Sequence, residues 1–421
     1  MTTYSAVRTT GIYCRPGCGA KPLAENVRTF ELAAAAEAAG YRACLRCRPY
    51  RVAGTIADDA PELVCRAVQL IIAGVLDESG EAALGARLGL SARHLRRMFQ
   101  EHLGVTPDQF ARSRRAHFAR RLLDDTDLGI ADVAFASGFG SLRQFNRAIR
   151  EVFRATPREL RDRRRRTDRL VADGGLVLRL PYNPPYDWDA MAGFLADHAI
   201  PGVESVEDGI YRRTISLDGD PGLLEIGPGG PDHLLLTAHL PYWEGVIHVA
   251  ERAAALVGLQ SEPLLARTLL AEDPTIGPLI AERPGIRVLG AWGPFEVAVQ
   301  AVVRDHDVLH KLVTTYGVPV PGLGHGLTHA FPSAEVLAAA ELVGPLAQAV
   351  AQGNIKLDVG DDTLIRSLEA VPGVSRKAAH HVAMRLGARD AWPLDGAAED
   401  LRPWRSLAAM HIMVARGAPA T

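Results

Sequence analysis

The sequence contains few cysteines, few aromatic residues and almost no net charge. Its 421 residues include five Cys and 6% Phe, Trp and Tyr together, and the formal net charge is −2. It has no uncharged apolar run of about 18 residues or more, so no membrane-spanning helix is predicted. The N-terminus lacks the apolar core and cleavage site of a signal peptide, which argues against secretion and hence against disulfide bonds. We therefore expect a cytoplasmic protein without a membrane partner.

The low net charge conceals a strong difference between the two halves of the chain. Residues 1–170 contain 29 Lys and Arg against 19 Asp and Glu, whereas residues 171–421 contain 18 against 30. A basic front half suits DNA, because the phosphates repel an acidic surface. With 48% apolar residues, a chain of this length is expected to form about three or four domains, each with its own core.

Four of the five cysteines lie in two close pairs. Cys14 and Cys18 form C-x3-C, and Cys44 and Cys47 form C-x2-C. Two such pairs, separated by the length of a small fold, are typical of structural zinc, because each pair approaches the metal from one turn of chain. Two disulfides are the alternative, which the missing secretion signal disfavours. Cys65 lies in an apolar helical stretch and is predicted to be a core residue.

The segments around the paired cysteines carry a more specific pattern. "AVRTTGIYCRPGC" (Ala6–Cys18), "ENVRTF" (Glu25–Phe30) and "AAGYRACLRCRPY" (Ala38–Tyr50) closely resemble the zinc domain of Ada-type DNA methyl-phosphotriester repair proteins. The resemblance implies Zn²⁺ held by all four thiolates, with Cys14 accepting a methyl group from a DNA phosphate. A metal-bound thiolate is an electron-rich nucleophile. Its methylation removes one negative charge facing the DNA, so the transfer can act as a binding switch.

The sequence of residues 91–107 recurs fifty positions later, in residues 141–157. Each copy begins with a serine suited to capping a helix, continues as an amphipathic helix, and ends before a Thr-Pro that cannot continue it. A short helical stretch and a glycine turn precede each copy, so the pattern predicts two helix-turn-helix motifs. The identical pairs are Ser91 and Ser141, Arg93 and Arg143, Arg97 and Arg147, Glu101 and Glu151, Thr106 and Thr156, and Pro107 and Pro157.

This doubled motif resembles the DNA-binding domain of the AraC/XylS family over about residues 60–165. The resemblance implies that the second helix of each motif enters the major groove of duplex DNA. A bundle of amphipathic helices with merely solvated arginines is the alternative, which the internal repeat disfavours. The predicted base or phosphate contacts are His94, Arg96, Arg143, Gln144 and Asn146.

The rear half alternates between strand-like and helical patterns. The segment Leu176–Ile215, which contains "PPYDW", resembles the N-terminal α+β domain of AlkA-type 3-methyladenine DNA glycosylases II. "RPGIRVLGAWGPFEVAVQAV" and "RPWRSLAAMHIM" extend the resemblance to an all-helical helix-hairpin-helix glycosylase domain, from about residue 251 to the end. The resemblance implies excision of alkylated bases from DNA, although three segments of this domain look shortened.

The hairpin of such a domain is predicted in "VPGVSRKAA" (Val371–Ala379). Glycine there lets backbone N–H groups approach a DNA phosphate, which makes Gly373 a predicted contact. Ser375 takes the place of the usual second glycine and is also a predicted contact, although a positive φ would strain it. The resemblance places the catalytic aspartate at Asp395, with Asp390 as a weaker substitute; either could instead cap a helix. A carboxylate there would stabilise the oxocarbenium-like charge of the transition state.

Lys377, His381 and Met413 occupy the positions at which the family stacks an extruded base among aromatic side chains. A lysine repels the cationic alkylated base that an aromatic face would attract. Lys377 also coincides with the Schiff-base lysine of lyase-type relatives. One alternative function is therefore a lyase-type glycosylase that uses Lys377. Another is a methylation-sensing transcriptional regulator with an inactive glycosylase domain.

The predicted fold class is multidomain and mainly α, with α+β parts. We expect a small zinc domain (1–53), a doubled helix-turn-helix bundle (58–165), an AlkA-N-like α+β domain (174–250) and a shortened helix-hairpin-helix glycosylase domain (251–421). The predicted function is alkylation-damage DNA repair and its regulation, by methyl transfer, sequence-specific DNA binding and base excision. The predicted cofactor is Zn²⁺, and the predicted partners are alkylated and operator duplex DNA and RNA polymerase.

Overall fold

The computed structural model describes residues 3–20, 22–52, 61–165, 168–170, 174–260, 263–357 and 362–417. The chain forms two compact units that interleave along the sequence. Unit 1 comprises residues 1–183, 242–251 and 260–262, and unit 2 comprises residues 184–241, 252–259 and 263–421. The boundary predicted between residues 53 and 58 lies outside the described residues.

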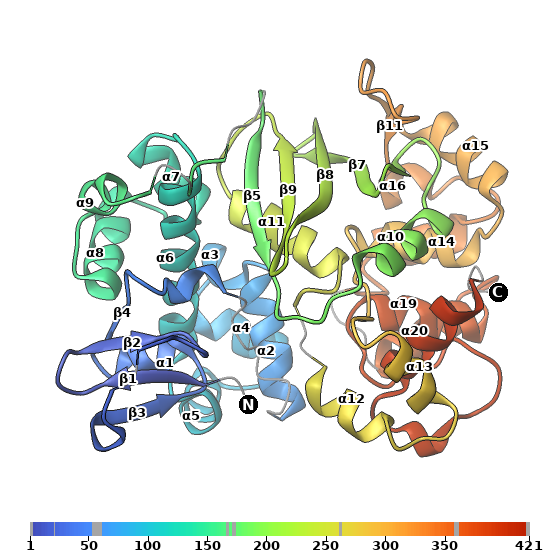
Figure 1. Cartoon of the computed structure of the whole chain (residues 1–421). Helices are drawn as coiled ribbons and strands as arrows, with labels where there is room; N and C mark the ends of the chain where they lie inside the picture. Colours follow the sequence, from blue (N-terminus) through green and yellow to red (C-terminus); the bar gives the residue numbers. More distant parts are fainter. Residues whose placement is uncertain are drawn as a thin grey trace. The chain divides into compact units, whose positions relative to one another are not determined.

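Unit 1 begins with four short strands: β1 (Tyr4–Val7), β2 (Ile12–Cys14), β3 (Val27–Phe30) and β4 (Arg42–Ala43). They form one sheet in the order β3-β1-β2-β4, next to the helix α1 (Ala33–Ala38) (Figure 1). β1 pairs antiparallel with β2 and β3, whereas β2 and β4 run parallel. Because Tyr13 pairs with Ala43, the next residues lie at the same edge of the sheet: Cys14 ends β2, and Cys44 directly follows β4.

A bundle of helices completes most of unit 1. Its helices are α2 (Glu62–Ile72), α3 (Val75–Glu78), α4 (Glu81–Arg87), α5 (Ala92–Leu103), α6 (Pro107–Asp125), α7 (Ile130–Ala136), α8 (Leu142–Phe153) and α9 (Pro157–Asp162). The long helix α6 contacts α2, α5, α7, α8 and α9, and so forms the centre of the bundle. Cys65 on α2 is only 8% exposed, which confirms its prediction as a core residue.

Both serines predicted to cap the second helices do so. Ser91 accepts a hydrogen bond from the backbone N–H three residues later (3.2 Å), and Ser141 does the same (3.3 Å). Thr106 and Thr156 begin α6 and α9 with reciprocal capping boxes, each followed by a proline at the first helical position. These local interactions satisfy the N–H groups that a helix start leaves free, and they fix where each helix begins.

The two copies of the repeat end differently. The C-cap of α5 is Gly104, with φ 68° and ψ 14°, whereas the C-cap of α8 is Arg154, with φ 54° and ψ 34°. Both positions are left-handed, a conformation that glycine adopts readily and L side chains resist. Both copies therefore end in the left-handed conformation, but only the first copy has a glycine there.

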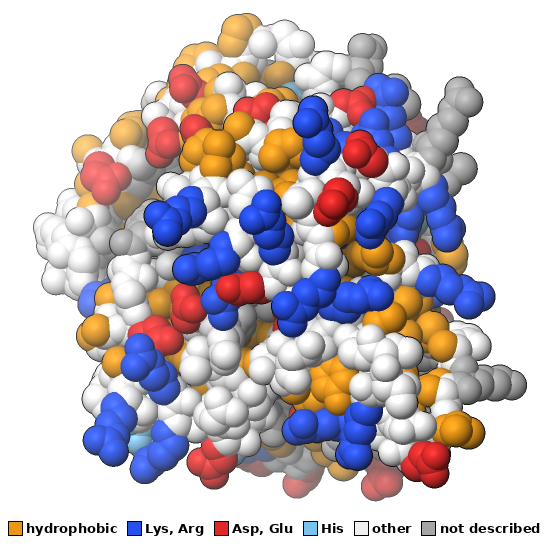
Figure 2. Space-filling model, turned by 90° about the vertical axis from the view of Figure 1, so that its left-hand side faces the viewer, with side chains coloured by type: hydrophobic (Ala, Val, Ile, Leu, Met, Phe, Trp, Pro, Cys, Tyr) orange, Lys and Arg blue, Asp and Glu red, His pale blue; other side chains and the backbone are white. Residues whose placement is uncertain are grey.

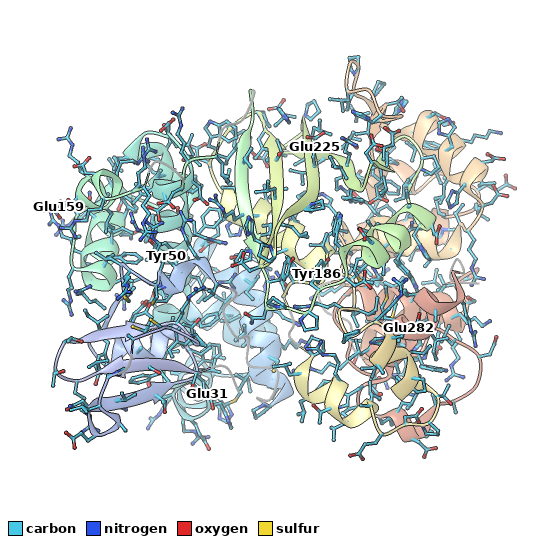
Figure 3. The ribbon with its side chains drawn as sticks, viewed as in Figure 1. Glu31, Tyr50, Glu159, Tyr186, Glu225 and Glu282 are labelled. Carbon is cyan, nitrogen blue, oxygen red and sulfur yellow. The ribbon has the colours of Figure 1, made fainter. Side chains whose placement is uncertain are left out.

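The strand β5 (Leu176–Pro181) is the last strand of unit 1 in sequence. In unit 2, α10 (Trp188–Asp197) is followed by an antiparallel meander of β6 (Glu204–Glu207), β7 (Ile210–Leu217), β8 (Asp220–Gly230) and β9 (His233–His239). Alternate residues of β9 are buried, as expected for a sheet with one covered face. On β8, Glu225 (labelled in Figure 3) pairs with Arg212 of β7 at 2.8 Å.

In the described residues, the regular structure of the rest of unit 2 is helical apart from one short antiparallel pair, β10 (Val318–Pro319) and β11 (His329–Ala330). Its helices are α11 (Val246–Leu256, shared with unit 1), α12 (Leu264–Leu270), α13 (Ile276–Glu282), α14 (Pro294–Val302), α15 (His306–Tyr316), α16 (Ala334–Leu337), α17 (Gly344–Ala351), α18 (Asp362–Glu369), α19 (Arg376–Arg385) and α20 (Arg405–Arg416). One apolar core joins α14 to α17 through Val299, Leu309, Leu337 and Val343. The predicted fold class, mainly α with α+β parts, is confirmed.

Candidate functional site

Three of the four predicted zinc ligands lie together. The Sγ atoms of Cys14, Cys18 and Cys47 all lie within 4.8 Å of one another. Tetrahedral zinc with Zn–S bonds of about 2.3 Å separates its sulfurs by about 3.8 Å, so the cluster has a suitable size. Cys44 lies outside this triplet, but its thiol interacts with those of Cys47 and Cys14.

The protonation of these thiols depends on their close spacing. Burial raises the pKa of Cys14, and the neighbouring Cys47 and Cys44 raise it further. Burial also raises the pKa of Cys47 to about 12. The pKa of Cys44 is lowered: burial opposes the shift, but backbone N–H groups of Cys47 and Arg46 stabilise its thiolate. Clustered thiols resist ionisation together unless a cation compensates them, and coordination deprotonates a thiol outright. The donor set therefore fits Zn²⁺.

Tyr13, next to Cys14, connects the zinc domain to the helix bundle within unit 1. Its hydroxyl donates a hydrogen bond to Glu37 Oε1 (2.6 Å) and lies 3.1 Å from His117 Nε2 on α6. The same His117 nitrogen lies 2.6 Å from Glu37 Oε1. Burial raises the pKa of Tyr13 well above its usual value, and the Glu37 carboxylate adds to this effect. Tyr13 is therefore a protonated donor that joins β2, α1 and α6.

A second buried network joins the end of the zinc domain to the same bundle. The Tyr50 hydroxyl (labelled in Figure 3) donates to Asp124 Oδ2 at 3.0 Å, and Arg48 pairs with Asp168 at 2.6 Å. Arg120, only 2% exposed, lies 2.9 Å from the Asp124 carboxylate. Removing one member would leave a buried charge without its partner, which is strongly destabilising. These contacts therefore specify how the zinc domain docks on the bundle.

The two residues of α5 that were predicted to contact DNA, His94 and Arg96, each contact another side chain of the protein. Arg96 is exposed, but its guanidinium pairs with Glu81 at the start of α4. His94 is half-buried, and its Nδ1 lies 3.1 Å from the Arg97 guanidinium. Arg93 and Arg97 are exposed on the same helix and were absent from the predicted contacts. The sequence repeat could have indicated them, because arginine also stands at the equivalent positions of the second copy.

On α8, Arg143 and Gln144 are exposed, as a DNA contact requires. The Asn146 amide instead donates to the Leu142 carbonyl of the same helix at 2.8 Å. Arg147 is exposed too, and it was missed as a contact. Figure 2 shows the side of the molecule on which Figure 1 draws α8 and α9, with Lys and Arg side chains spread across it. Such a surface suits the phosphates of DNA.

The predicted hairpin lies between α18 and α19. Gly373 has a φ of 87°, and a Cβ placed there would meet nothing within 4 Å, so only the backbone conformation favours glycine. Ser375 has an extended backbone, with φ −78° and ψ 159°, and its hydroxyl accepts a hydrogen bond from Ala378 N–H at 3.2 Å. The strain expected at Ser375 is therefore absent, because this position caps α19 and needs no positive φ.

The two candidate aspartates have different surroundings. The Asp395 side chain is 89% exposed, and its Oδ2 lies 3.0 Å from Lys377 Nζ. Both oxygens of Asp390 are occupied by Arg405, at 2.7 and 3.0 Å, and Arg402 approaches one of them to 3.1 Å. A bidentate arginine pair of this kind is a strong structural contact. Neither aspartate is the N-cap of a described helix.

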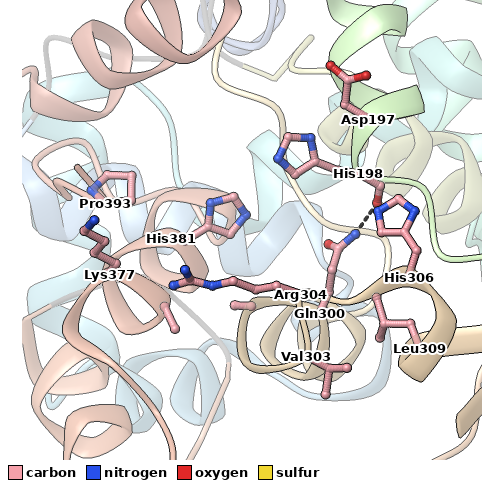
Figure 4. A pocket seen from close by; sticks show the side chains of 12 residues that line it. Asp197, His198, Gln300, Val303, Arg304, His306, Leu309, Lys377, His381 and Pro393 are labelled. Atoms are coloured by element: carbon pink, nitrogen blue, oxygen red, sulfur yellow. Dashed lines mark hydrogen bonds between the residues drawn. The ribbon is translucent and has the colours of Figure 1, made fainter. Parts of the chain in front are cut away.

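Lys377 and His381 line one pocket, between α10, α14, α15 and α19 (Figure 4). Its polar lining also includes Asp197, His198, Gln300, Arg304 and His306. These residues were not predicted as pocket residues, because they come from helices far apart in the sequence. Met413 on α20 lies in the wall of another hollow, so the structure does not bring it together with Lys377 and His381.

Three family models match the chain in sequence order. The metal binding domain of Ada matches residues 2–50, a helix-turn-helix domain matches residues 84–163, and the AlkA N-terminal domain matches residues 177–293. The order agrees with the predicted fusion of Ada-type, AraC-type and AlkA-type parts.

Three relatives are similar to this chain over different parts of its length. The probable bifunctional transcriptional activator/DNA repair enzyme AlkA of Mycobacterium tuberculosis is 36% identical, over 97% of this chain and 91% of the relative. The DNA-3-methyladenine glycosylase 2 of Escherichia coli is 28% identical, over 56% of this chain and 97% of the relative. The bifunctional transcriptional activator/DNA repair enzyme Ada of Escherichia coli is 33% identical, over 37% of this chain and 43% of the relative.

A metal-binding thiol cluster followed by paired DNA-reading helices and a glycosylase-like half defines a class of protein that combines DNA repair with transcriptional regulation. Since the mycobacterial relative matches almost the whole chain, this chain belongs to the family of AlkA-type bifunctional transcriptional activator/DNA repair enzymes. It binds Zn²⁺ through its Ada-type domain, and DNA is its partner. Among the described residues, no helix has the length and apolar character needed to cross a membrane.

Proposed function

We propose that the chain repairs two kinds of alkylation damage and couples one of them to transcription. In the first reaction, Cys14 Sγ attacks the methyl carbon of a methyl phosphotriester in DNA. An S–C bond forms as the O–CH₃ bond breaks, and the phosphate is released as an ordinary phosphodiester anion. Bound Zn²⁺ would supply the thiolate at neutral pH. The cluster of Cys14, Cys18 and Cys47 supports this proposal, and Cys44, which follows the neighbouring strand, is the proposed fourth ligand.

The methyl transfer is tested by mass spectrometry. After incubation with DNA that carries a methyl phosphotriester, one methyl group should appear on Cys14. Cys14→Ser should abolish the transfer, whereas Cys65→Ser, which alters the cysteine outside the cluster, should retain it. A methyl group on any other cysteine would contradict the assignment of Cys14.

The regulatory part of the proposal joins this transfer to the helix-turn-helix motifs. Methylation turns the Cys14 thiolate into a neutral thioether, which reduces the repulsion from nearby phosphates. We assign base or phosphate contacts to the exposed Arg143 and Gln144, and supporting contacts to His94, Arg96 and Asn146. RNA polymerase is the proposed partner at the operator, and the cytoplasm, where bacterial DNA lies, is the proposed location.

The second reaction is excision of a damaged base by the helix-hairpin-helix part. The observation that best supports this reaction concerns the two aspartates. Asp395 is exposed and forms an ion pair with Lys377, which lines the pocket, whereas Asp390 is already paired with arginines. The bond between the base and C1′ breaks, and water adds to C1′ while the Asp395 carboxylate stabilises the positive charge of the sugar. Gly373 and Ser375, at the tip of the hairpin, are the proposed contacts to the DNA backbone.

Base release from alkylated duplex DNA tests this assignment. Asp395→Asn should abolish release while thermal unfolding and DNA affinity stay unchanged, because the carboxylate acts on charge that develops only in the transition state. Asp400→Asn, another exposed aspartate of the same segment, is the matched control and should retain release. Release that survives Asp395→Asn would contradict the role of Asp395. If the wild type transferred methyl groups but released no base, the chain would be a regulator with an inactive glycosylase half.

A lyase that uses Lys377 is the second candidate, favoured by the 3.0 Å distance between Lys377 Nζ and Asp395 Oδ2. There Nζ, after losing a proton, would form a bond to C1′ as the base leaves, and the resulting imine would permit strand cleavage by elimination. Borohydride would trap this imine as a protein–DNA adduct, which Lys377→Met should prevent. Base release without a trapped adduct would exclude the lyase.

A further inference from the structure

The pocket that contains Lys377 is lined by both apolar and polar side chains. None of the described residues that line it is Phe, Tyr or Trp. Its cavity volume is about 60 Å³, room for roughly four to six water molecules, which is the scale of one small planar heterocycle. The pocket is thus large enough for a base but lacks the carbocyclic rings on which a cationic base stacks best.

Two imidazole rings lie near each other in the wall of this pocket. His198 follows α10 and His381 lies on α19; the rings are nearly parallel (9°), with centroids 6.2 Å apart. Figure 4 shows the His381 ring pointing from its helix toward His198. Phe194 stacks on His198 at 4.0 Å and supports that wall.

His381 has hydrogen-bonding capacity that the protein leaves unused. It is 6% exposed, and its Nδ1 has no hydrogen-bond partner among the described residues. Burial lowers its pKa well below the usual value, and Arg385 adds to this effect, so the ring is neutral, with one donor and one acceptor nitrogen. Buried polar groups in native proteins are nearly always paired, so an unpaired nitrogen in a pocket wall indicates a ligand group.

The charges around the pocket disfavour a cation. Arg304 lines it and forms no ion pair with a described residue, whereas the charge of Lys377, which also lines it, is compensated by Asp395 at 3.0 Å. Asp197 supplies a negative charge, but Figure 4 shows its carboxylate directed away from the two imidazole rings. A cationic base in this pocket would meet the positive charge of Arg304 and no strong π-face.

We infer that this pocket accepts an uncharged damaged base that carries a ring carbonyl, in preference to a cationic alkylated purine, and that His381 determines the preference. One hydrogen bond would join the base to His381, either from an imidazole N–H to the carbonyl or from the neighbouring ring N–H to the acceptor nitrogen of the imidazole. The inference rests on the proposed base excision and specifies its substrate class.

Single-turnover release is measured with the full-length protein on two duplexes of one sequence, containing hypoxanthine (uncharged) or 7-methylguanine (cationic). The wild type should release hypoxanthine faster. His381→Phe keeps a planar ring without nitrogen, and should lower hypoxanthine release about tenfold, the effect of one lost buried hydrogen bond. His381→Gln, which keeps a donor and an acceptor, should retain most of it. Arg304→Gln should raise 7-methylguanine release severalfold.

His411→Phe is the matched control. His411 is also buried, with an unpartnered Nε2, but it lines another hollow of unit 2, so its replacement should not change the ratio of the two rates. Faster release of 7-methylguanine by the wild type would overturn the inference and leave base excision intact. Release of neither base would contradict base excision itself. The inference would then be decided by affinity: tighter binding of the hypoxanthine duplex would support it, and equal affinity would refute it.

Discussion

Replacement of Arg154 by glycine should stabilise unit 1. Arg154 ends α8 with φ 54°, and its counterpart Gly104 ends α5 with φ 68°. The left-handed conformation costs an L residue about 1–2 kcal/mol, and the greater freedom of glycine in the unfolded chain offsets about 0.5–1 kcal/mol of that. Arg154 is exposed and forms no ion pair with a described residue, so little is lost with its side chain. The expected net gain is about 0.5–1 kcal/mol.

Scanning calorimetry of the full-length protein measures this gain. For a unit of this size, about 1 kcal/mol corresponds to a shift in Tm of about 2–4 °C, so Arg154→Gly should raise the transition of unit 1 by about 1–4 °C. Gly104→Ala is the reciprocal control. Its Cβ would lie at an ordinary distance, 3.6 Å, from Ala35 Cβ, so only the backbone cost should appear, as a lower Tm. A lower Tm for Arg154→Gly would show that the arginine side chain stabilises the unit and would refute the reasoning.

Three further perturbations test other parts of the structure. Burial lowers the pKa of His198 and of His411 to about 4, below the value of about 6.5 in an unfolded chain. The unfolded state therefore binds more protons between these values, and the free energy of unfolding of unit 2 should fall as the pH drops from about 6.5 to 4. Urea titrations at several pH values should show this fall, and His411→Phe should reduce it. Cys47→Ser should release zinc and unfold the four-stranded sheet, measured by metal content and circular dichroism. Arg143→Gln should lower the salt dependence of DNA binding by about one phosphate contact if it binds phosphate, measured by titrations at several salt concentrations. A loss confined to one operator sequence would indicate a base contact instead.

Features that depend on neighbouring residues were predictable from the sequence. The caps at Ser91 and Ser141 follow from a serine before an amphipathic run, since the hydroxyl reaches the N–H group three residues later. The proximity of Cys14 and Cys18 follows from their spacing, because a short turn joins them. Cys47 reaches them through the pairing of β2 with β4, which a local rule does not specify.

Features that join distant segments could not be predicted in this way. The part of the pocket wall next to His381 comes from His198, which the fold of unit 2 brings there. The pairing of Asp390 with Arg405 distinguishes it from Asp395, and periodicity contains no sign of that ion pair. The backbone conformation of Ser375 could not be predicted either. The resemblance shows that related hairpins have glycine at this position, but it does not give the φ that this hairpin adopts.

The zinc domain and the helix bundle share one compact unit, and this arrangement bears on how a change at Cys14 reaches the DNA-reading helices. Arg48 pairs with Asp168, and Tyr13 reaches His117 on α6, in contacts that are largely shielded from water. A buried charge that loses its partner is costly, so the zinc domain cannot pivot freely on the bundle. The DNA contacts proposed for the two parts would therefore act in a single binding event, with a high effective concentration of the second part once the first is bound. Because residues 171–421 are acidic, we expect the affinity for DNA to depend mainly on the basic front half of the chain. Loss of one negative charge at Cys14 should then strengthen the attraction between this half and the phosphates.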